Sequence, residues 1–294
     1  MKNLLNKYNN GNYTVEIYDD GTKIRETEEE IFEASFPENI DIKITNYCLN
    51  NGDFCYESSS SEGKHGNLNV EFIKSLHPYT ELAIGGGNPL SHPDLYEFLT
   101  ILKENKIIAN ITIRQNDFLN NLELLKYYTD NKLLYGIGVS LIEPTDEFIK
   151  EIQQFPNAVI HTIAGLLTKE QLTKLFNKKL KVLILGYKTR GKGENYKCEF
   201  EKDIFINIEF LKQNILKLTP FFKVVSFDNL AIEQLELQKQ INPKVWEEFY
   251  MGDDGQHTMY IDLVQQTFSK NSLTEERFEL KSNIEEMFKI VKKL

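Results

Sequence analysis

The 294-residue sequence has few cysteines, no excess of basic residues and no long apolar run. Its three cysteines are too few for a disulfide framework, which favours a reducing, cytoplasmic location. The net charge of −10 argues against general binding to nucleic acids or anionic membranes, because such binding needs a basic surface. No stretch approaches the roughly 18 apolar residues that span a bilayer, and the N-terminus lacks the apolar core of a signal peptide. We therefore expect a cytoplasmic protein without a membrane or general nucleic-acid partner.

From residue 40 onward, short apolar segments typical of strands alternate with helical segments. We expect strands at Ile40–Thr45, Glu81–Ile84, Ala109–Ile113, Tyr135–Ser140, Ala158–Ile163 and Lys181–Leu185. Strands that alternate with helices predict an α/β fold with a parallel sheet and right-handed crossovers. A partial (β/α)6 TIM-like barrel fits this pattern best. In such barrels the functional side chains lie at the C-terminal ends of the strands.

The segments on either side of the barrel are expected to cover it. Residues 1–39 contain the alternating run Tyr13–Tyr18 followed by Asp20 and Gly21, which predicts a β-hairpin because this pair accepts the positive φ angles of a tight turn. Residues 40–230 would form the barrel. Residues 231–294 would form a C-terminal extension that packs on it.

Two strand ends carry residues typical of a cofactor site. The loop after the first strand contains Cys48, Phe54 and Cys55, and thiolates are the preferred ligands of soft metal centres. The second strand ends in the glycine cluster Gly85, Gly86 and Gly87, which lets another group approach the backbone closely. Asn88 and Pro89 follow, and the proline restricts the direction in which the chain continues. Soft ligands at one strand end and accessible backbone amides at the next indicate a shared cofactor site.

The cysteine loop resembles that of the radical S-adenosylmethionine enzymes. The family loop follows the first barrel strand and reads Cys, three residues, Cys, one residue, an aromatic residue, Cys. Cys48, Phe54 and Cys55 match the first cysteine, the aromatic residue and the last cysteine, whereas Gly52 stands at the middle cysteine. The resemblance implies a [4Fe–4S] cluster held by Cys48 and Cys55, since thiolates normally hold such clusters. Asp53, next to the vacant position, could supply an oxygen ligand.

The glycine turn resembles the family segment Gly-Gly-Glu-Pro, with Asn88 in place of the glutamate. The resemblance implies binding of S-adenosylmethionine, with the Asn88 amide oxygen accepting a hydrogen bond from the methionine amine. Gln115 after the third strand and Ser140 at the end of the fourth occupy positions that contact the ribose and the methionine carboxylate in the family. Both side chains could instead satisfy loop backbone groups, and the sequence leaves these roles open.

Further polar residues follow later strands. Tyr187 and Lys188 come after the sixth strand, and Asp228 ends the apolar strand near residues 223–227. They could orient a polar substrate at the barrel mouth, and a buried lysine there is also what a Schiff-base lyase needs. The polar segment Gly191–Lys197 is expected to be a lid or insertion, followed by a helix from about Ile204.

Three functions are consistent with these residues. In the first, a reduced cluster cleaves S-adenosylmethionine, and the 5′-deoxyadenosyl radical takes a hydrogen atom from an unknown small-molecule or peptide substrate, with electrons from an external donor. In the second, the barrel is catalytically silent and acts as a binding or regulatory module, which Gly52 favours because a lost ligand weakens cluster retention. The third is a lyase that uses Lys188, which leaves the cysteine loop unexplained. We assign the chain to the radical S-adenosylmethionine type, with Gly52 arguing for impaired activity.

Overall fold

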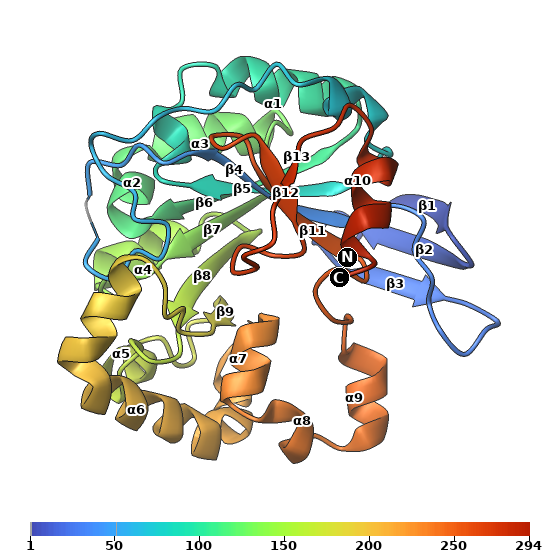
Figure 1. Cartoon of the computed structure of the whole chain (residues 1–294). Helices are drawn as coiled ribbons and strands as arrows, with labels where there is room; N and C mark the ends of the chain where they lie inside the picture. The colour runs from blue at the N-terminus through green and yellow to red at the C-terminus, as the bar shows by residue number, and fades with distance from the viewer. Residues whose placement is uncertain (1, 51) are drawn as a thin grey trace.

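The computed structural model describes residues 2–50 and 52–294, which form two sheets with helices around the larger one (Figure 1). The small sheet is antiparallel, in the order β1-β2-β3, with strands Leu4–Asn10, Tyr13–Tyr18 and Lys23–Glu26. The segment expected to be a hairpin thus forms β2 and β3, and β1 adds a third strand. Sequence analysis missed β1 because its residues Asn6, Lys7, Asn9 and Asn10 are polar and strand propensity is low for such a run.

The large sheet has ten strands in the order β10-β9-β8-β7-β6-β5-β4-β11-β12-β13. From β10 through β4 to β11 every pairing is parallel, whereas β12 and β13 add antiparallel strands at the edge. The parallel strands are β4 (Asn39–Thr45), β5 (Glu81–Gly86), β6 (Ile108–Arg114), β7 (Gly136–Ser140), β8 (Ala158–Ile163), β9 (Lys181–Leu185), β10 (Val224–Phe227) and β11 (Thr258–Asp262). The edge strands are β12 (Thr267–Ser269) and β13 (Phe278–Glu279).

Helices connect the parallel strands, and Figure 1 shows α1 to α6 around the outer side of the arc that the strands form. They are α1 (Leu95–Glu104), α2 (Gln115–Asn120), α3 (Leu122–Asp130), α4 (Asp146–Ile152), α5 (Lys169–Lys174) and α6 (Lys192–Leu218). The later helices are α7 (Asn229–Gln234), α8 (Leu237–Gln240), α9 (Pro243–Phe249) and α10 (Ile284–Val291). Short 3-10 turns lie at Glu71–Ser75, Pro89–Ser91 and Thr219–Phe221. No helix in the described part of the chain is both long enough and apolar enough to cross a membrane.

The strands have one apolar and one more polar face, and this division positions the candidate site. Ile40 and Ile42 of β4 are fully buried, as are Leu82 and Ile84 of β5, whereas residues between them are more accessible. Since side chains alternate along a strand, the apolar residues face the helices and the others face the inner side of the arc. Asp41 therefore lies on the inner face, where the polar groups of several strands meet.

The start of α6 and the C-terminal residues 231–294 differ from what the sequence predicted. The helix expected from about Ile204 begins earlier than predicted, because α6 starts at Lys192 and includes most of the polar segment Gly191–Lys197 that was expected to be a lid or insertion. The backbone of Phe200 is non-helical (φ −116°, ψ 26°), so α6 consists of two helical segments joined by a kink at this residue. Within residues 231–294, β11 pairs in parallel with β4 and so takes part in the large sheet.

Candidate functional site

The cysteine loop and the glycine turn lie side by side. The amide of Gly87 donates to the carbonyl of Thr45 at 2.7 Å, and the amide of Asn88 donates to the carbonyl of Tyr47 at 2.8 Å. A Cβ at Gly86 would lie 2.1 Å from the Thr45 oxygen, and one at Gly87 would lie 2.2 Å from the Tyr47 oxygen. Only glycine permits this approach, and the positive φ of Gly86, 117°, adds the same requirement. The two loops that the sequence singled out thus pack directly against each other.

The glycine turn leaves space for a ligand at one position. A Cβ at Gly85 would meet nothing within 4 Å, so the inner side of this residue is open. The Asn88 side-chain oxygen accepts from the amide of Leu90 at 3.1 Å and caps the turn that begins at the buried Pro89. One lone pair of that oxygen remains for a ligand donor. The open surface therefore lies at Gly85, with Asn88 at its border.

The position of the missing cysteine faces an arginine. A Cβ at Gly52 would lie 3.7 Å from Arg114 Nη1 and 4.0 Å from the Cβ of Cys55, which are ordinary contacts. Arg114 ends β6 and donates from Nη1 to the carbonyl of Asn50 at 3.2 Å. Cys48 is buried, and Cys55 is half-buried. Sequence analysis missed Arg114, which has no local motif and reaches the loop only through the order of the strands.

The donor set does not fit a cluster held in the manner of the family. Among the described residues, no group of three or more His, Cys, Asp or Glu side chains is arranged to hold a metal ion. Asp53 is exposed in the same loop, and the third cysteine, Cys198, is exposed on α6. Since clusters of this kind rely on thiolates, the two cysteines of the loop leave the set incomplete.

The start of α6 supports the cysteine loop. The Lys192 amide donates to the carbonyl of Cys55 at 3.2 Å, and the rings of Phe54 and Tyr196 meet edge to face at 5.7 Å. Tyr187 is buried and its hydroxyl donates to the Gly193 carbonyl at 2.6 Å. Burial raises the pKa of Tyr187 to about 12, so this side chain stays neutral. Phe54 and Tyr187 thus both contact the segment that orders the loop.

Lys188 lies inside the arc among aromatic and acidic groups. Its Nζ donates to the Ser272 hydroxyl at 3.0 Å and stands 4.0 Å from the centre of the Tyr56 ring. Burial alone would lower the pKa of Lys188, but Tyr56, Asp228 and Asp41 outweigh it and raise the pKa. A Schiff-base lysine needs the neutral amine, so this environment gives the lyase interpretation no support.

Two carboxyl groups from well-separated strands, β10 and β4, act on this lysine. Asp228 follows β10 and accepts from the amides of Gly186 at 2.9 Å and Ala231 at 2.7 Å, which caps α7. Burial raises the pKa of Asp228. Asp41 of β4 is open to the inside of the arc, but the protein atoms that surround it there exclude part of its hydration and raise its pKa to about 6; Asp254 and Asp228 add to this rise and Lys188 opposes it. Sequence analysis missed Asp41, although a charged residue between two apolar strand positions is a usable signal.

The other expected ligand contacts lie at the ends of β6 and β7. The Gln115 oxygen accepts from the amides of Ile142 and Glu143 at 2.8 and 3.0 Å, and its nitrogen donates to the Glu143 carbonyl at 2.7 Å. These bonds leave one N–H of Gln115 for a ligand. Ser140 is half-buried at the tip of β7, opposite Arg114 of β6 and His161 of β8 in the strand register. Burial lowers the pKa of His161 to about 4, so its ring is neutral.

Comparisons with known proteins show the fold. No family model matches the chain, and no curated protein matches it. Structures of SuiB from Streptococcus suis do match. The structure bound to the precursor peptide SuiA has a TM-score of 0.55, 16% identity, and covers 84% of this chain and 63% of that chain. The structure bound to S-adenosylmethionine has a TM-score of 0.51 and 15% identity over 84% and 64% of the two chains. This chain thus shares its fold with SuiB and spans less than two thirds of its length.

Proposed function

We propose that this chain is a partial barrel of the radical S-adenosylmethionine type that binds S-adenosylmethionine and a peptide, and that it acts as a binding module while Gly52 occupies the cysteine loop. The main-chain contact between the cysteine loop and the glycine turn carries the proposal, because it forms the arrangement that the resemblance requires. The fold supports it as well, since one SuiB structure holds S-adenosylmethionine and another holds a precursor peptide.

The residues around Gly85 fit S-adenosylmethionine in chemistry. The open side of Gly85 would receive the flat and extended parts of the ligand, as a side chain there would fill that space. The Arg114 guanidinium suits the methionine carboxylate, and the Asn88 oxygen suits the ammonium group. The hydroxyl of Ser140 and the remaining N–H of Gln115 suit the ribose hydroxyls. The bound ligand would bring an activated sulfonium group to the inner face.

A second candidate is the radical enzyme itself, and the shape of the loop at Gly52 favours it. A Cβ there meets only ordinary contacts, so the loop retains a conformation that a cysteine would fit. An active form needs a further cluster ligand and an external electron donor. The residues of this chain supply two of the thiolates, Cys48 and Cys55, and the binding module is therefore the better-supported function.

Titration calorimetry with S-adenosylmethionine tests the proposal. We expect saturable binding to the native chain. The affinity of Gly85→Ala should be lower by at least about tenfold, which corresponds to about 1.4 kcal/mol of binding free energy. The thermal unfolding midpoint of Gly85→Ala should stay unchanged because the new methyl group meets no protein atom within 4 Å. The exposed Asn116→Ala is the matched control and should bind as the native chain does. No binding by the native chain, or full affinity in Gly85→Ala, contradicts the proposal.

A further inference from the structure

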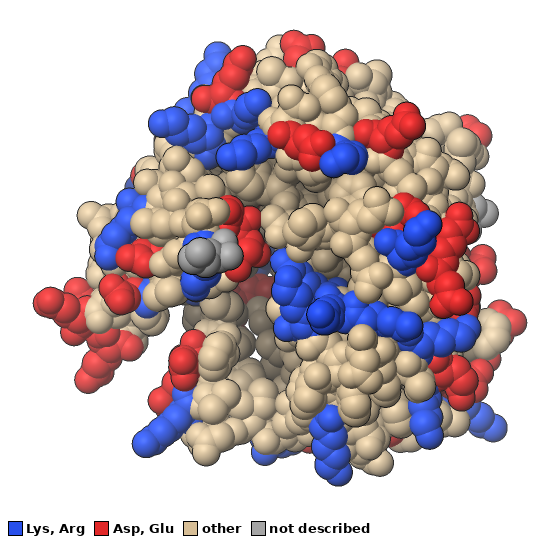
Figure 2. Space-filling view, turned by 180° about the vertical axis from the view of Figure 1, so that it is seen from behind, with Lys and Arg blue, Asp and Glu red and all other residues tan. Residues whose placement is uncertain are grey.

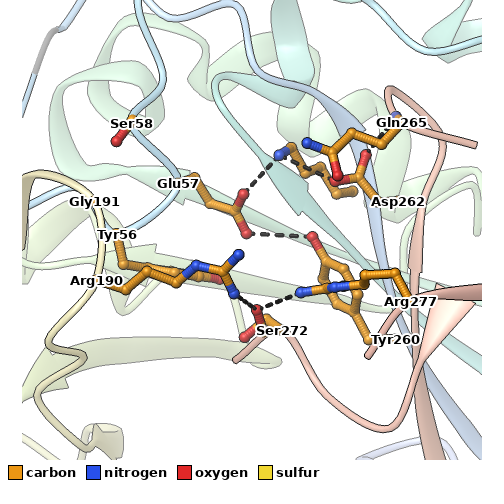
Figure 3. Close-up of a pocket in the computed structure, with 11 residues that line it drawn as sticks. Tyr56, Glu57, Ser58, Arg190, Gly191, Tyr260, Asp262, Gln265, Ser272 and Arg277 are labelled. Carbon is orange, nitrogen blue, oxygen red and sulfur yellow. Dashed lines mark hydrogen bonds and ion pairs between the residues drawn. The ribbon is translucent and has the colours of Figure 1, made fainter. Parts of the chain in front are cut away.

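A polar cavity of about 220 Å³ lies beside the cysteine loop (Figure 3). Tyr56 and Glu57, which directly follow Cys55, form one wall, and Arg190 comes from the segment after β9. The other wall belongs to the C-terminal segment and includes Tyr260, Ser272 and Arg277. Because the cavity joins these segments, a group bound in it would lie at the mouth of the arc, next to the candidate ligand site.

The carboxylates of this cavity are already paired. Lys43 Nζ lies 2.6 Å from Glu57 Oε2 and 3.2 Å from Asp262 Oδ2, and all three side chains are largely buried. The hydroxyl of Tyr260 donates to the other oxygen of Glu57 at 3.3 Å. Burial by itself would lower the pKa of Lys43, but Glu57 and Asp262 outweigh it and raise the pKa, so the amine stays charged. The two carboxylates of the cavity are therefore neutralised by Lys43 or bonded to Tyr260 on one side of the cavity.

Two arginines face the same cavity without an acidic partner among the described residues. Figure 3 shows their guanidinium groups approaching Ser272 from opposite sides. Arg190 Nη1 donates to the carbonyl of Ser272 at 3.0 Å, and Arg277 Nη2 donates to the same oxygen at 2.7 Å. Arg277 Nη1 also donates to the Ser269 hydroxyl at 2.9 Å. Each guanidinium has five N–H donors, so several on each remain for a ligand.

The side chains that line the cavity carry a net positive charge, whereas the whole chain is negative. The chain has a net charge of −10, whereas the cavity is lined by the three cations Lys43, Arg190 and Arg277 and the two carboxylates Glu57 and Asp262. Figure 2 shows that Lys and Arg side chains also gather in a band on one face of the molecule rather than being spread evenly. A single excess positive charge in a cavity of this size suits one monoanionic group better than a dianion.

We propose that Arg190 and Arg277 bind a carboxylate of the peptide that occupies the mouth of the arc. A planar carboxylate matches the fork of a guanidinium, and two such forks facing one another would hold both of its oxygens. The inference rests on the proposed function for the identity of the ligand as a peptide. It adds that the peptide places a carboxylate, from an acidic side chain or from its C-terminus, beside the cysteine loop.

Binding of three capped tripeptides, measured by titration calorimetry, tests the inference. The probes are acetyl-Ala-Glu-Ala-amide, acetyl-Ala-Gln-Ala-amide, and acetyl-Ala-Ala-Ala with a free C-terminal carboxylate. We expect the native chain to bind a carboxylate probe at least about tenfold more tightly than the glutamine probe, because charge-assisted hydrogen bonds are the stronger kind. Preference for the glutamate or the free C-terminal probe identifies the source of the carboxylate. Added salt should weaken this preference.

Arg190→Gln is the main variant because Arg190 is exposed and donates to the main-chain carbonyls of Ser272 and Leu273, so the fold should persist. We expect it to bind the glutamate and glutamine probes equally. Arg277→Lys keeps the charge but loses the fork, and should lose most of the preference. The control Lys126→Gln removes an exposed cation on α3 and should leave the preference intact. Equal binding of all probes by the native chain, or an unchanged preference in Arg190→Gln, overturns the inference.

Two further arms separate the possible failures. Inorganic phosphate that binds more tightly than either carboxylate probe would overturn the assignment of a carboxylate. Titration of S-adenosylmethionine into the same samples reports on the proposed function. Normal binding of S-adenosylmethionine without any carboxylate preference overturns only this inference, whereas a carboxylate preference without S-adenosylmethionine binding overturns only the proposed function.

Discussion

At the residue scale, Gly52 and the neighbouring Arg114 decide whether the cysteine loop can hold a metal cluster. A glycine offers no ligand at the position where the resemblance implies a thiolate, and the neighbouring group is a cation at the end of β6. A guanidinium near a cysteine favours the thiolate, because an adjacent positive charge lowers the pKa of a thiol. The surroundings of residue 52 are therefore suited to a thiolate that the chain lacks.

A cysteine at position 52 should enable the chain to bind a cluster. We expect Gly52→Cys to hold about four irons and matching sulfide after anaerobic reconstitution, against far less in the native chain, because three thiolates complete the ligand set. Iron and sulfide analysis with absorption spectra measures this. Cys198→Ser removes the exposed thiol on α6 and serves as the control, with no expected change. Equal iron content in Gly52→Cys and the native chain would show that the missing ligand is not what limits cluster assembly.

At the scale of elements, the candidate site depends on how loops are tied to helices. The first turn of α2 carries Gln115, whose amide makes three hydrogen bonds to the loop between β7 and α4. The start of α6 supports the cysteine loop in a similar way through the bond between Lys192 and Cys55. One side chain at a strand end and one main-chain bond at a helix start thus hold the loops of neighbouring units in place.

Removing the Gln115 amide should mainly destabilise the fold. We expect Gln115→Ala to lower the free energy of unfolding by about 2 kcal/mol, because two loop amides and one carbonyl lose their partner. Urea denaturation measures this. Asn116→Ala, an exposed neighbour in the same turn, should be nearly neutral. Unchanged stability of Gln115→Ala together with lost affinity for S-adenosylmethionine would show that the side chain serves the ligand instead.

At the scale of the whole molecule, a buried ion network joins the small sheet to the large one. Glu38 is fully buried just before β4, and Arg25 of β3 binds it with Nε at 2.9 Å and Nη2 at 3.2 Å. Lys23 lies 3.4 Å from Glu38 and 2.7 Å from Glu81 of β5. The Tyr13 hydroxyl of β2 donates to Glu38 at 2.5 Å. The N-terminal sheet is thereby attached to the N-terminal ends of the parallel strands, opposite the candidate site.

Neutralising Glu38 should weaken this attachment in a pH-dependent way. Burial by itself raises the pKa of Glu38, but Lys23 and Arg25 and the bonds from Arg25 and Tyr13 outweigh it and lower the pKa. The unfolded chain therefore binds more protons, so this stabilisation is present above the unfolded pKa and is lost as the pH falls through the folded one. We expect Glu38→Gln to cost about 3 kcal/mol near neutral pH, because two buried cations lose a partner.

Denaturation curves at several pH values measure this difference. The gap between the native chain and Glu38→Gln should shrink as the pH falls below the pKa of the unfolded carboxyl and toward the lowered pKa of folded Glu38. Glu16→Gln removes an exposed pair with Lys7 in the same small sheet and should cost less than about 1 kcal/mol. A gap that does not change with pH would show that packing, rather than the charge of Glu38, makes the contribution.

Local patterns in the sequence were sufficient for the strands β4 to β9, the cysteine loop and the glycine turn. Alternation along a strand, cysteine spacing and glycine clusters are properties of neighbouring residues, so they can be read before any folding is considered. Gly86 and Gly87 could be assigned to a close backbone approach for the same reason. The identity of the approaching backbone, at Thr45 and Tyr47, was not contained in that pattern.

Only the tertiary structure decided which distant residues share a site. Arg114 lies beside Gly52, Arg190 and Arg277 approach the same residue, and Lys188 donates a hydrogen bond to Ser272. These contacts form because the order of strands in the sheet brings segments far apart in the chain to one edge. No local motif marks such residues, since an isolated arginine or aspartate on a strand looks like any solvated charge. The sequence by itself determined the repeating α/β units and the missing thiolate, whereas the charges that surround the site were decided by strand pairing.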